Sequence, residues 1–377
     1  MIDSFSAYLK ELNHKRIRAQ RIRRVLRTDI PKRLDIENPG NQAKRILFVD
    51  ALWGLGDALY VNGLASALAK SGKDVYVATL NRTLTVYQYN RDLKRVFSLE
   101  DEKDLEVCAN VSFDCAIDLS YVGLDRWDIR MNLLRRLHTF CWTCTELAKD
   151  AKVFHRYIDL TKFAHVSERM AAIFNAVCPE QLPLERIGPV VSLPDTSLCD
   201  MLGRRYVYIN TVAGEDDRCM TNKQVDALRE WFESQDYYIG YFYIPGEYNL
   251  EEGETVKQVK GNFIDALKLV RQCDMVITPD TAIVHVASAF GIPTLALFCG
   301  GEMDYFKKFP MSDMWAPLAS PSLSLWVDVE KHDKTKKVKP IPVGKIQSHS
   351  IISSLELLLS RMESNQPQFL LNRQNAL

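Results

Sequence analysis

Residues 275–298 read MVITPDTAIVHVASAFGIPTLALF, and they constrain the fold of this chain more than any other segment. A short apolar run comes first, and residues with the apolar periodicity of a helix follow it. After Gly291, Ile292 and Pro293 a second apolar run begins. This succession of strand, turn, helix, turn and strand is typical of a parallel α/β sheet.

The turn before this helix contains Asp280 and Thr281. The first N–H groups of a helix have no partner within the helix, and the helix dipole is positive there. Such a turn is suited to binding an anion, above all phosphate. Asp280 or Thr281 can equally serve only as the helix cap, and the residues alone leave both hypotheses open.

The composition is that of a globular protein. With 377 residues, the chain is long enough for two domains. Lys and Arg together number 48, as do Asp and Glu, so no net charge favours nucleic acid. Nine scattered cysteines suggest reduced thiols in the cytoplasm. Cys141 and Cys144 have redox-type spacing but lie in an apolar segment, which favours packing.

No membrane-spanning segment is expected. Residues 1–10 lack the apolar core of a signal peptide. Residues 282–301 are weakly charged and about as long as a membrane span, but Gly291 and Pro293 divide them. The basic residues 10–33 have partly helical apolar spacing. They fit either a helix on an anionic membrane surface or a helix packed on the body of the protein.

Strands and helices are expected to alternate in two α/β domains. We predict a basic helical segment over 1–44, a first domain over 45–195, a second over 200–349, and a helix with a polar tail over 350–377. The helices are predicted at 58–71, 222–234 and 350–362. The strands are predicted at 45–50, 74–79, 96–99, 115–119, 138–142, 206–210, 238–243, 275–278 and 294–298.

Several common site motifs do not occur. Gly54 and Gly56 lack the third glycine of the dinucleotide fingerprint, because Leu59 stands in its place. No phosphate-binding loop ends in Lys-Ser or Lys-Thr, and neither His-Glu-x-x-His nor Gly-x-Ser-x-Gly is present. These absences point to another class of nucleotide-using protein.

Four motifs, in order, resemble glycosyltransferase family 9, the bacterial lipopolysaccharide heptosyltransferases. Gly56-Asp57 is similar to the opening loop of the family, and residues 113–119 to its "YDLVIDLQ" strand. Residues 210–228 lie over "HPGAS…KRWPAERFAEL", and residues 280–285 resemble the "DTGxxH" turn. The resemblance covers about residues 45–358.

The resemblance implies an α/β fold of GT-B type, with two Rossmann-like domains facing across a cleft. It implies an inverting, metal-independent glycosyltransferase that needs no cofactor. The donor would be ADP-heptose and the acceptor a lipopolysaccharide inner-core sugar. Asp57 matches the general base of the family and follows the first strand, at the edge where open α/β sheets bind ligands. Its alternative role is to cap a helix.

On the donor side the resemblance implies a set of residues: Gly56, Arg218, Glu247, Asp280, Thr281, Ala282 and His285. Arg218 falls on a phosphate-binding Lys of the family, and Arg can bind phosphate bidentately. Thr281, Ala282 and Ile283 would offer N–H groups to the diphosphate, and Asp280 would contact sugar hydroxyls. His285 would contact the turn or the nucleotide, or else be a core histidine. Glu247 would reach the ribose or the base.

Acceptor binding is assigned to Arg126 and Arg130, because lipopolysaccharide core carries carboxylates and phosphates. The alternative is a solvated basic helix face that includes Arg135 and Arg136. The protein would be cytoplasmic, with a peripheral contact to the inner face of the bacterial inner membrane if the basic segment binds there.

Three departures from the family pattern concern the donor. Ala282 replaces a glycine, Met220 replaces a tryptophan, and residues 51–54 replace small hydroxyl residues. Two alternatives therefore stay open. One is transfer of another nucleotide sugar to capsule, O-antigen or protein. The other is a non-catalytic binder of sugar nucleotides or glycans.

Overall fold

The structure is a computed structural model that describes residues 42–52, 54–120, 126–145, 153–179, 183–194, 206–235, 238–242, 256–259, 262–301, 308–327 and 340–364, with single residues 20, 149, 151 and 303. Contacts divide the chain into two units. The first comprises Met1–Trp53, Ala65–Lys162 and Ala172–Leu184, and the second Gly54–Leu64, Phe163–Ala171 and Glu185–Leu377. The basic residues 10–33 (except Gln20), Trp53 and Glu247 lie outside the described residues, as do residues 195–205, which include the boundary predicted between the two domains.

The first unit contains a six-stranded parallel sheet in the order β3-β2-β1-β4-β5-β6. Its strands are β1 (Arg45–Asp50), β2 (Asp74–Thr79), β3 (Arg95–Ser98), β4 (Cys115–Asp118), β5 (Phe140–Thr143) and β6 (Arg156–Tyr157). This is the doubly wound order, in which the direction of winding reverses beside β1.

The second unit repeats this topology. Its six parallel strands follow the order β12-β11-β10-β7-β8-β9. They are β7 (Tyr206–Asn210), β8 (Tyr238–Phe242), β9 (Val256–Val259), β10 (Met275–Pro279), β11 (Thr294–Leu297) and β12 (Leu323–Leu325). When the strands are counted from β7, the order is that of the first sheet, and the winding reverses between β7 and β10.

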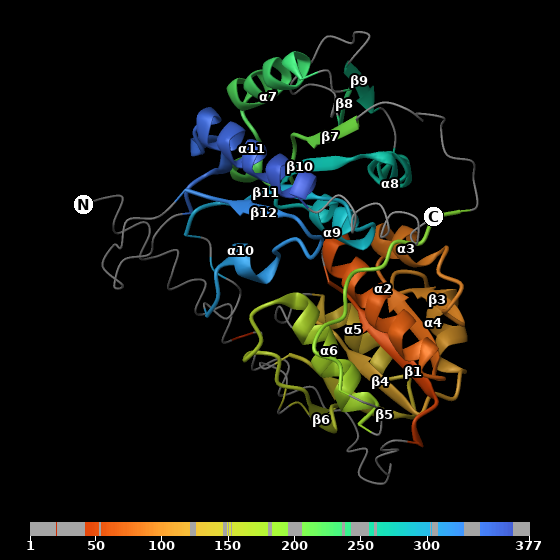
Figure 1. The fold of residues 1–377 in the computed structure, drawn as a ribbon. Helices are drawn as coiled ribbons and strands as arrows, with labels where there is room; N and C mark the ends of the chain where they lie inside the picture. The colour runs from red at the N-terminus through yellow and green to blue at the C-terminus, as the bar shows by residue number, and fades with distance from the viewer. Residues whose placement is uncertain are drawn as a thin grey trace. The chain divides into compact units, whose positions relative to one another are not determined.

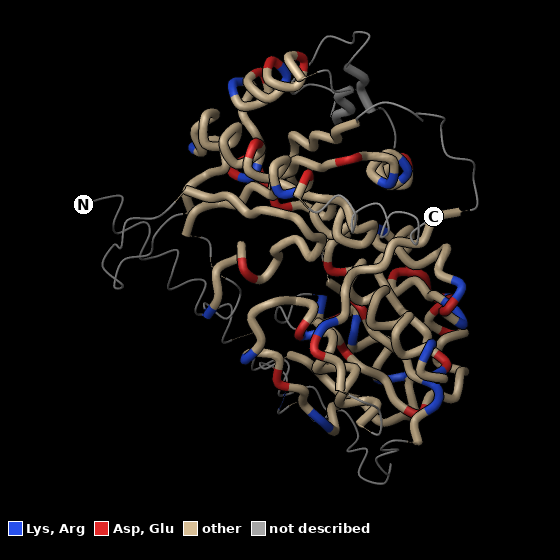
Figure 2. Tube along the Cα trace, in the orientation of Figure 1, with Lys and Arg blue, Asp and Glu red and all other residues tan. Residues whose placement is uncertain are grey.

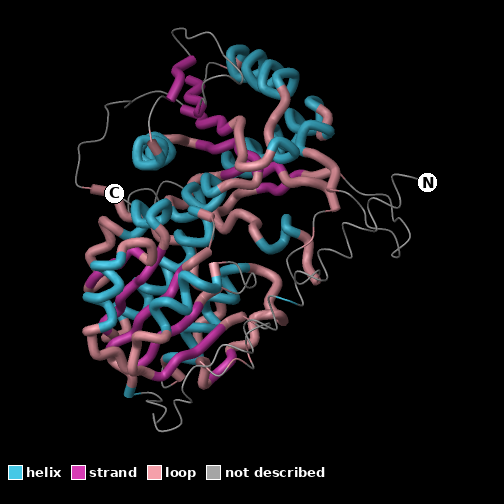
Figure 3. The backbone as a smooth tube through the Cα atoms, turned by 180° about the vertical axis from the view of Figure 1, so that it is seen from behind, coloured by secondary structure: helices cyan, strands magenta, loops and turns pink. Residues whose placement is uncertain are grey.

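Helices follow most strands, as the alternation of colours in Figure 3 shows. The α-helices are α2 (Leu55–Lys70), α3 (Leu84–Tyr87), α4 (Glu102–Ala109), α5 (Trp127–Leu134), α6 (Val166–Val177), α7 (Asn222–Ser234), α8 (Phe263–Gln272), α9 (Ala282–Ala289), α10 (Met311–Met314) and α11 (Ser348–Ser364). Short 3-10 turns are η2 (Asn81–Thr83), η4 (Asp216–Arg218) and η5 (Val343–Lys345). The predicted α/β architecture is confirmed.

Helix α2 is buried on all sides along its middle. Every residue from 58 to 66 is buried, so the helix has no solvated face there. Asn62 and Ser66 are polar residues within this stretch, and Nδ2 of Asn62 donates to the Val190 carbonyl at 3.0 Å. The chain also makes a close contact at Gly63, where a methyl group would lie 2.0 Å from the Gly188 carbonyl oxygen. Only glycine fits at this position.

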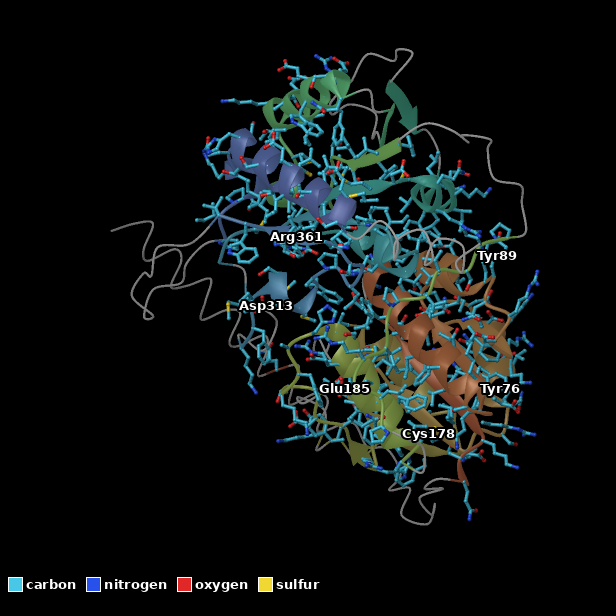
Figure 4. The ribbon with its side chains drawn as sticks, in the orientation of Figure 1. Tyr76, Tyr89, Cys178, Glu185, Asp313 and Arg361 are labelled. Carbon is cyan, nitrogen blue, oxygen red and sulfur yellow. The ribbon has the colours of Figure 1, made fainter. Side chains whose placement is uncertain are left out.

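One face of the first sheet packs on α4 and α5. Leu47, Val49 and Phe97 share an apolar cluster with Leu105 and Met131 from these helices. Tyr76, labelled in Figure 4, lies at the edge of this cluster, with ring centroids 6.4 Å from Phe97 and 5.2 Å from Phe113. The alternate strand residues, such as Phe48 and Val77, are also buried, so helices cover both faces.

The core of the second unit includes the last helix. Ile351, Leu355 and Leu358 of α11 join Leu228 of α7 and Ile277 of β10 in one cluster, and α7 and α11 lie side by side in Figure 1. In the described part of both units, basic and acidic residues are interspersed (Figure 2).

The predicted strands agree with the structure to within two residues, but the predicted start of the first long helix is wrong. Residues 54–57 were expected to form a loop, whereas α2 begins at Leu55. The reason is that the Gly54 carbonyl accepts a helical hydrogen bond from the N–H of Ala58 at 3.2 Å. Gly56 and Asp57 therefore belong to the first turn of a helix, where the helix dipole favours a carboxylate.

The expected acceptor contact at Arg130 is also corrected. Its side chain, like that of Asp118, has 0% exposure, and Nη1 lies 2.6 Å from Oδ2 of Asp118. A guanidinium with no exposed surface cannot meet an acceptor. Arg130 instead neutralises a carboxylate at the end of β4, and the face of the Trp127 ring lies 5.3 Å from it.

We predict that Arg130→Met lowers the free energy of unfolding by about 3–5 kcal/mol, because Asp118 keeps a buried charge without its cation. Arg136→Met is the matched control. Arg136 pairs with Glu102 at 2.6 Å, but both side chains are partly exposed, so we expect less than about 1 kcal/mol. Urea unfolding measures both. Similar small losses would contradict a structural role for Arg130.

Candidate functional site

Polar side chains meet where the winding of the second sheet reverses. Nδ2 of Asn210, the last residue of β7, donates to Oγ1 of Thr278 at 3.0 Å and to Oγ1 of Thr281 at 3.1 Å. It also donates to the Val212 carbonyl at 3.0 Å. These bonds fix the turn after β10 against the end of β7. Open α/β sheets bind their ligands at this kind of edge.

Arg218 reaches the same turn from η4. Its Nη1 lies 3.3 Å from Oδ2 of Asp280, and its Nε lies 3.8 Å from Oε2 of Glu215. The Arg218 side chain is 23% exposed and that of Asp280 8%. The structure thus brings together two residues predicted for the donor side. The Arg218 side chain is therefore partly exposed although it is paired with the Asp280 carboxylate.

Helix α9 is capped by Thr281. This residue has extended backbone angles, and its Oγ1 accepts a hydrogen bond from the N–H of Ile283 at 3.3 Å. The capping hypothesis therefore holds for Thr281. Because the N–H of Ile283 already has a partner, Ile283 can serve an anion only if it leaves the threonine. Ala282 is the first residue of the helix proper.

The start of α2 lies against the start of α9 within the second unit. A methyl group at Gly56 would lie 3.6 Å from Cα of Ala282 and 2.6 Å from Cδ2 of His285. A methyl group at Gly54 would lie 2.6 Å from Oδ2 of Asp57, so the carboxylate lies over Gly54. Two helix N-termini converge here, and both favour negative charge.

His285 belongs to a cluster of four rings, which we call the ring cluster: Tyr60, His165, His285 and Trp315. The His285 ring centroid lies 5.1 Å from that of Tyr60 and 5.1 Å from that of Trp315. His165 lies 6.2 Å from Tyr60, and its Nε2 is 3.0 Å from the Ala316 carbonyl oxygen. The cluster joins α2, the start of α6, α9 and the segment after α10.

Both histidines of the ring cluster are held neutral. Burial, with a smaller contribution from the nearby His165, lowers the pKa of His285 from 6.5 to about 3. Burial also lowers the pKa of His165, although its bond to Ala316 opposes this. Nδ1 of His165 accepts the N–H of Ser167 at 3.0 Å, so Nε2 carries the proton that Ala316 accepts. His285, with 3% exposure, is thus a core histidine in this structure.

The other predicted positions are more dispersed. Arg126 is half-buried in the first unit and caps α5 with a left-handed backbone, φ +53°. Met220, which stands in place of the tryptophan of the family, is buried in the second core. The roles of Arg126 and Glu247 stay predictions.

Sequence reasoning missed several polar groups. Asn210 was assigned to a strand and to the start of a family motif but to no site role, and Asp50 was assigned only to the end of β1. Asp50 is buried and accepts from Oη of Tyr87 at 2.5 Å and from the N–H of Leu52 at 3.1 Å. Both residues could have been identified from the sequence, because each is a polar residue at the end of an apolar strand. No sequence pattern predicted that Tyr60 and Trp315 would meet the histidines.

The comparisons with known proteins agree with this architecture. Residues 258–341 match the model of glycosyltransferase family 9 (heptosyltransferase). That segment includes β10, the turn and α9. No curated protein is similar enough in sequence to count as a match.

Solved structures are similar over most of the chain. The glycosyl transferase family 9 protein from Veillonella parvula DSM 2008 has a TM-score of 0.63 at 14% identity and covers 84% of this chain and 97% of its own. E. coli ADP-heptose lps heptosyltransferase II has a TM-score of 0.63 at 15% identity, with 85% and 99% covered. E. coli heptosyltransferase WaaC with ADP has a TM-score of 0.58 at 12% identity, with 86% and 98% covered. At such low identity the likeness concerns the fold.

Two parallel sheets with the same winding, together with these neighbours, define a glycosyltransferase fold of the GT-B type. Residues 258–341 also match the model of glycosyltransferase family 9. The resemblance to glycosyltransferase family 9 is confirmed, by sequence over residues 258–341 and by fold over most of the chain. These findings support a glycosyltransferase.

We predict that acid destabilises the second unit through the ring cluster. Unfolding lets His285 and His165 take up protons near pH 6.5, whereas the folded protein keeps His285 neutral down to about pH 3. The unfolded state then binds more protons, so stability falls as pH falls. The expected loss is at most about 1.4 kcal/mol per pH unit for each histidine, between pH 6.5 and about 5.

Urea unfolding at several pH values measures this slope. His285→Ala should make it shallower, and the exposed His138→Ala should not change it. A slope that is the same in all three proteins would show that His285 is not held neutral.

Proposed function

We propose that this protein is an inverting glycosyltransferase that moves heptose from ADP-heptose to a lipopolysaccharide inner-core sugar. The observation that carries the proposal is the meeting of the α2 and α9 starts in the second unit, with Arg218 beside Asp280. One helix start bears the proposed base, and the other a turn suited to a diphosphate. The family match over this turn and the likeness in fold to structures described as heptosyltransferases support the donor class.

The leaving group is the diphosphate of the donor. When the bond between the anomeric carbon and the phosphate oxygen breaks, the oxygen keeps the electron pair and its charge grows. Arg218 and the N–H groups of Thr281 and Ala282 would stabilise that charge. In the structure Asp280 holds Arg218, so a diphosphate has to share or replace this carboxylate. Asp280 would then be available to accept hydrogen bonds from hydroxyls of the sugar.

Asp57 is the proposed general base. Its carboxylate would accept the proton of the acceptor hydroxyl as that oxygen bonds to the anomeric carbon from the face opposite the diphosphate. One displacement inverts the configuration and requires no covalent intermediate with the enzyme. The first turn of a helix stabilises the charged, proton-accepting form of the carboxylate.

The proposal also concerns the acceptor and the cellular site. With Arg130 buried, Arg126 is the remaining proposed contact for an anionic acceptor. Among the described residues, no helix has the length and hydropathy to cross a membrane. We propose that the basic residues 10–33 contact an anionic cytoplasmic membrane surface. Vesicle binding with and without residues 1–38 tests this contact.

For the donor we predict that ADP binds more tightly than UDP, GDP or CDP, and that Arg218→Ala weakens ADP binding about 10- to 100-fold by removing a charged hydrogen-bond donor. Isothermal titration measures both. Arg229→Ala is the control, because Arg229 lies on α7 with Glu233 4.0 Å away. Preference for another nucleotide would replace the donor, and no nucleotide binding would favour the non-catalytic hypothesis.

For the base we predict that Asp57→Asn lowers kcat about 100- to 10,000-fold, with ADP affinity changed less than about twofold. Gly54→Ala is a milder variant. Its methyl group would press on Oδ2 of Asp57, the mobile end of that side chain, and shift the carboxylate without removing it. An intermediate loss of kcat is expected. Full turnover in Asp57→Asn would refute the base assignment.

A further inference from the structure

We infer that His285 is a positioning residue whose ring sets the spacing between the start of α2 and the start of α9. The inference rests on the proposed function, because it concerns how the proposed base is placed relative to the donor turn. It assigns His285 no contact with substrate. The nucleotide contact predicted from the sequence is replaced by an action through Gly56.

The ring of His285 lies directly against Gly56. A methyl group at Gly56 would lie 2.6 Å from Cδ2 of His285 and 3.2 Å from its Nε2. Real Cβ atoms do not approach other atoms to 2.6 Å, so the ring occupies the space of a side chain at position 56. The glycine is required here by close approach, since it lies in ordinary helical backbone.

The ring itself cannot move freely. Tyr60, one turn after Gly56 in α2, meets it edge to face, and Trp315 meets it at an angle of 50°. The residue after Trp315 is anchored in turn, because the Ala316 carbonyl accepts from His165 at 3.0 Å. With 3% exposure, His285 has no solvent space into which it could turn.

This contact also concerns the position of the reacting groups. Gly56 directly precedes Asp57, and its missing methyl group would lie 3.6 Å from Cα of Ala282. A shift of α2 away from His285 therefore moves the proposed base away from the proposed diphosphate turn. Displacements of about 1 Å can reduce turnover about 100-fold, because attack needs near-contact geometry.

Another observation separates this residue from ordinary apolar packing. Among the described residues, Nδ1 of His285 has no hydrogen-bond partner, although the atom is buried. An unsatisfied buried polar atom is unfavourable, and an apolar residue would avoid it. A flat five-membered ring fits beside a glycine backbone where a branched aliphatic chain or a six-membered ring would need more room. The shape of the imidazole ring therefore explains a histidine at position 285 better than its polarity does.

The test is a double-mutant cycle on kcat with Gly56→Ala and His285→Ala. Gly56→Ala alone should lower kcat at least tenfold, because its methyl group displaces the start of α2. In the His285→Ala background the methyl group finds the space of the ring, so adding Gly56→Ala should change kcat less than about threefold. In His285→Ala the ADP dissociation constant should change less than threefold, because the inference assigns the ring no contact with the nucleotide.

Gly63→Ala is the matched control on the same helix. Its methyl group would meet the Gly188 carbonyl oxygen at 2.0 Å and has no contact with His285. His285→Ala should therefore not relieve its effect. If Gly56→Ala lowers kcat by the same factor with and without the ring, the positioning role is wrong.

The outcome remains decisive if a variant folds poorly. Thermal unfolding of the four proteins measures the same coupling. His285→Ala alone should also lower kcat, because α2 loses the ring that sets its spacing from α9. This loss of kcat, together with rescue of the Tm of Gly56→Ala by His285→Ala, supports the inference. Unchanged kcat in His285→Ala overturns it. The cycle uses whichever nucleotide sugar the wild-type protein turns over. A wrong donor, or an active Asp57→Asn, would contradict the proposed function without altering the result of the cycle.

Discussion

A fully parallel sheet hides both of its faces under helices, and this constraint governs the rest of the structure. Such a sheet exposes polar groups mainly at the ends of its strands. In this chain β1 ends at Asp50, β4 at Asp118, β7 at Asn210 and β10 just before Asp280. Each of these four polar residues is buried or nearly so. Because these residues are buried, each needs a hydrogen-bond or ion-pair partner. The type of partner distinguishes the strand ends with a structural role from those proposed to bind a ligand.

Two ion pairs illustrate that separation. Arg130 and Asp118 lie 2.6 Å apart with no exposed surface, whereas Arg218 and Asp280 lie 3.3 Å apart and the arginine remains 23% exposed. A fully buried pair is expensive to disturb and therefore fixed. A longer, partly solvated pair can exchange its carboxylate for another anion at low cost. The same two residue types thus form a fixed pair in the first unit and, in the second, a partly exposed pair at the turn proposed to bind the diphosphate.

The sequence predicts the framework well because a buried parallel strand has an unmistakable apolar run. β1, β2 and β7 begin and end where the pattern places them. Short edge strands such as β6 and β12 were not predicted, since two or three residues carry no periodicity. The start of α2 was misplaced because glycines suggest a loop, although here Gly56 is required by the approach of a ring. Arg130 was taken for a surface residue because its partner lies twelve positions away, in another element. Local patterns contain no information about such partners.

The division of the chain has a consequence for anyone who wishes to study its halves separately. The second unit includes Gly54–Leu64 and Phe163–Ala171, which precede its first strand by many residues. A fragment cut before β7 would therefore lose Tyr60 and His165 and leave His285 and Trp315 without two of their neighbours. The strand order suggests two halves that could fold independently. The ring cluster, however, combines two rings that precede β7 in the sequence with two that follow it. This protein is better divided by chain complementation, in which both fragments are supplied together, than by expression of either half alone.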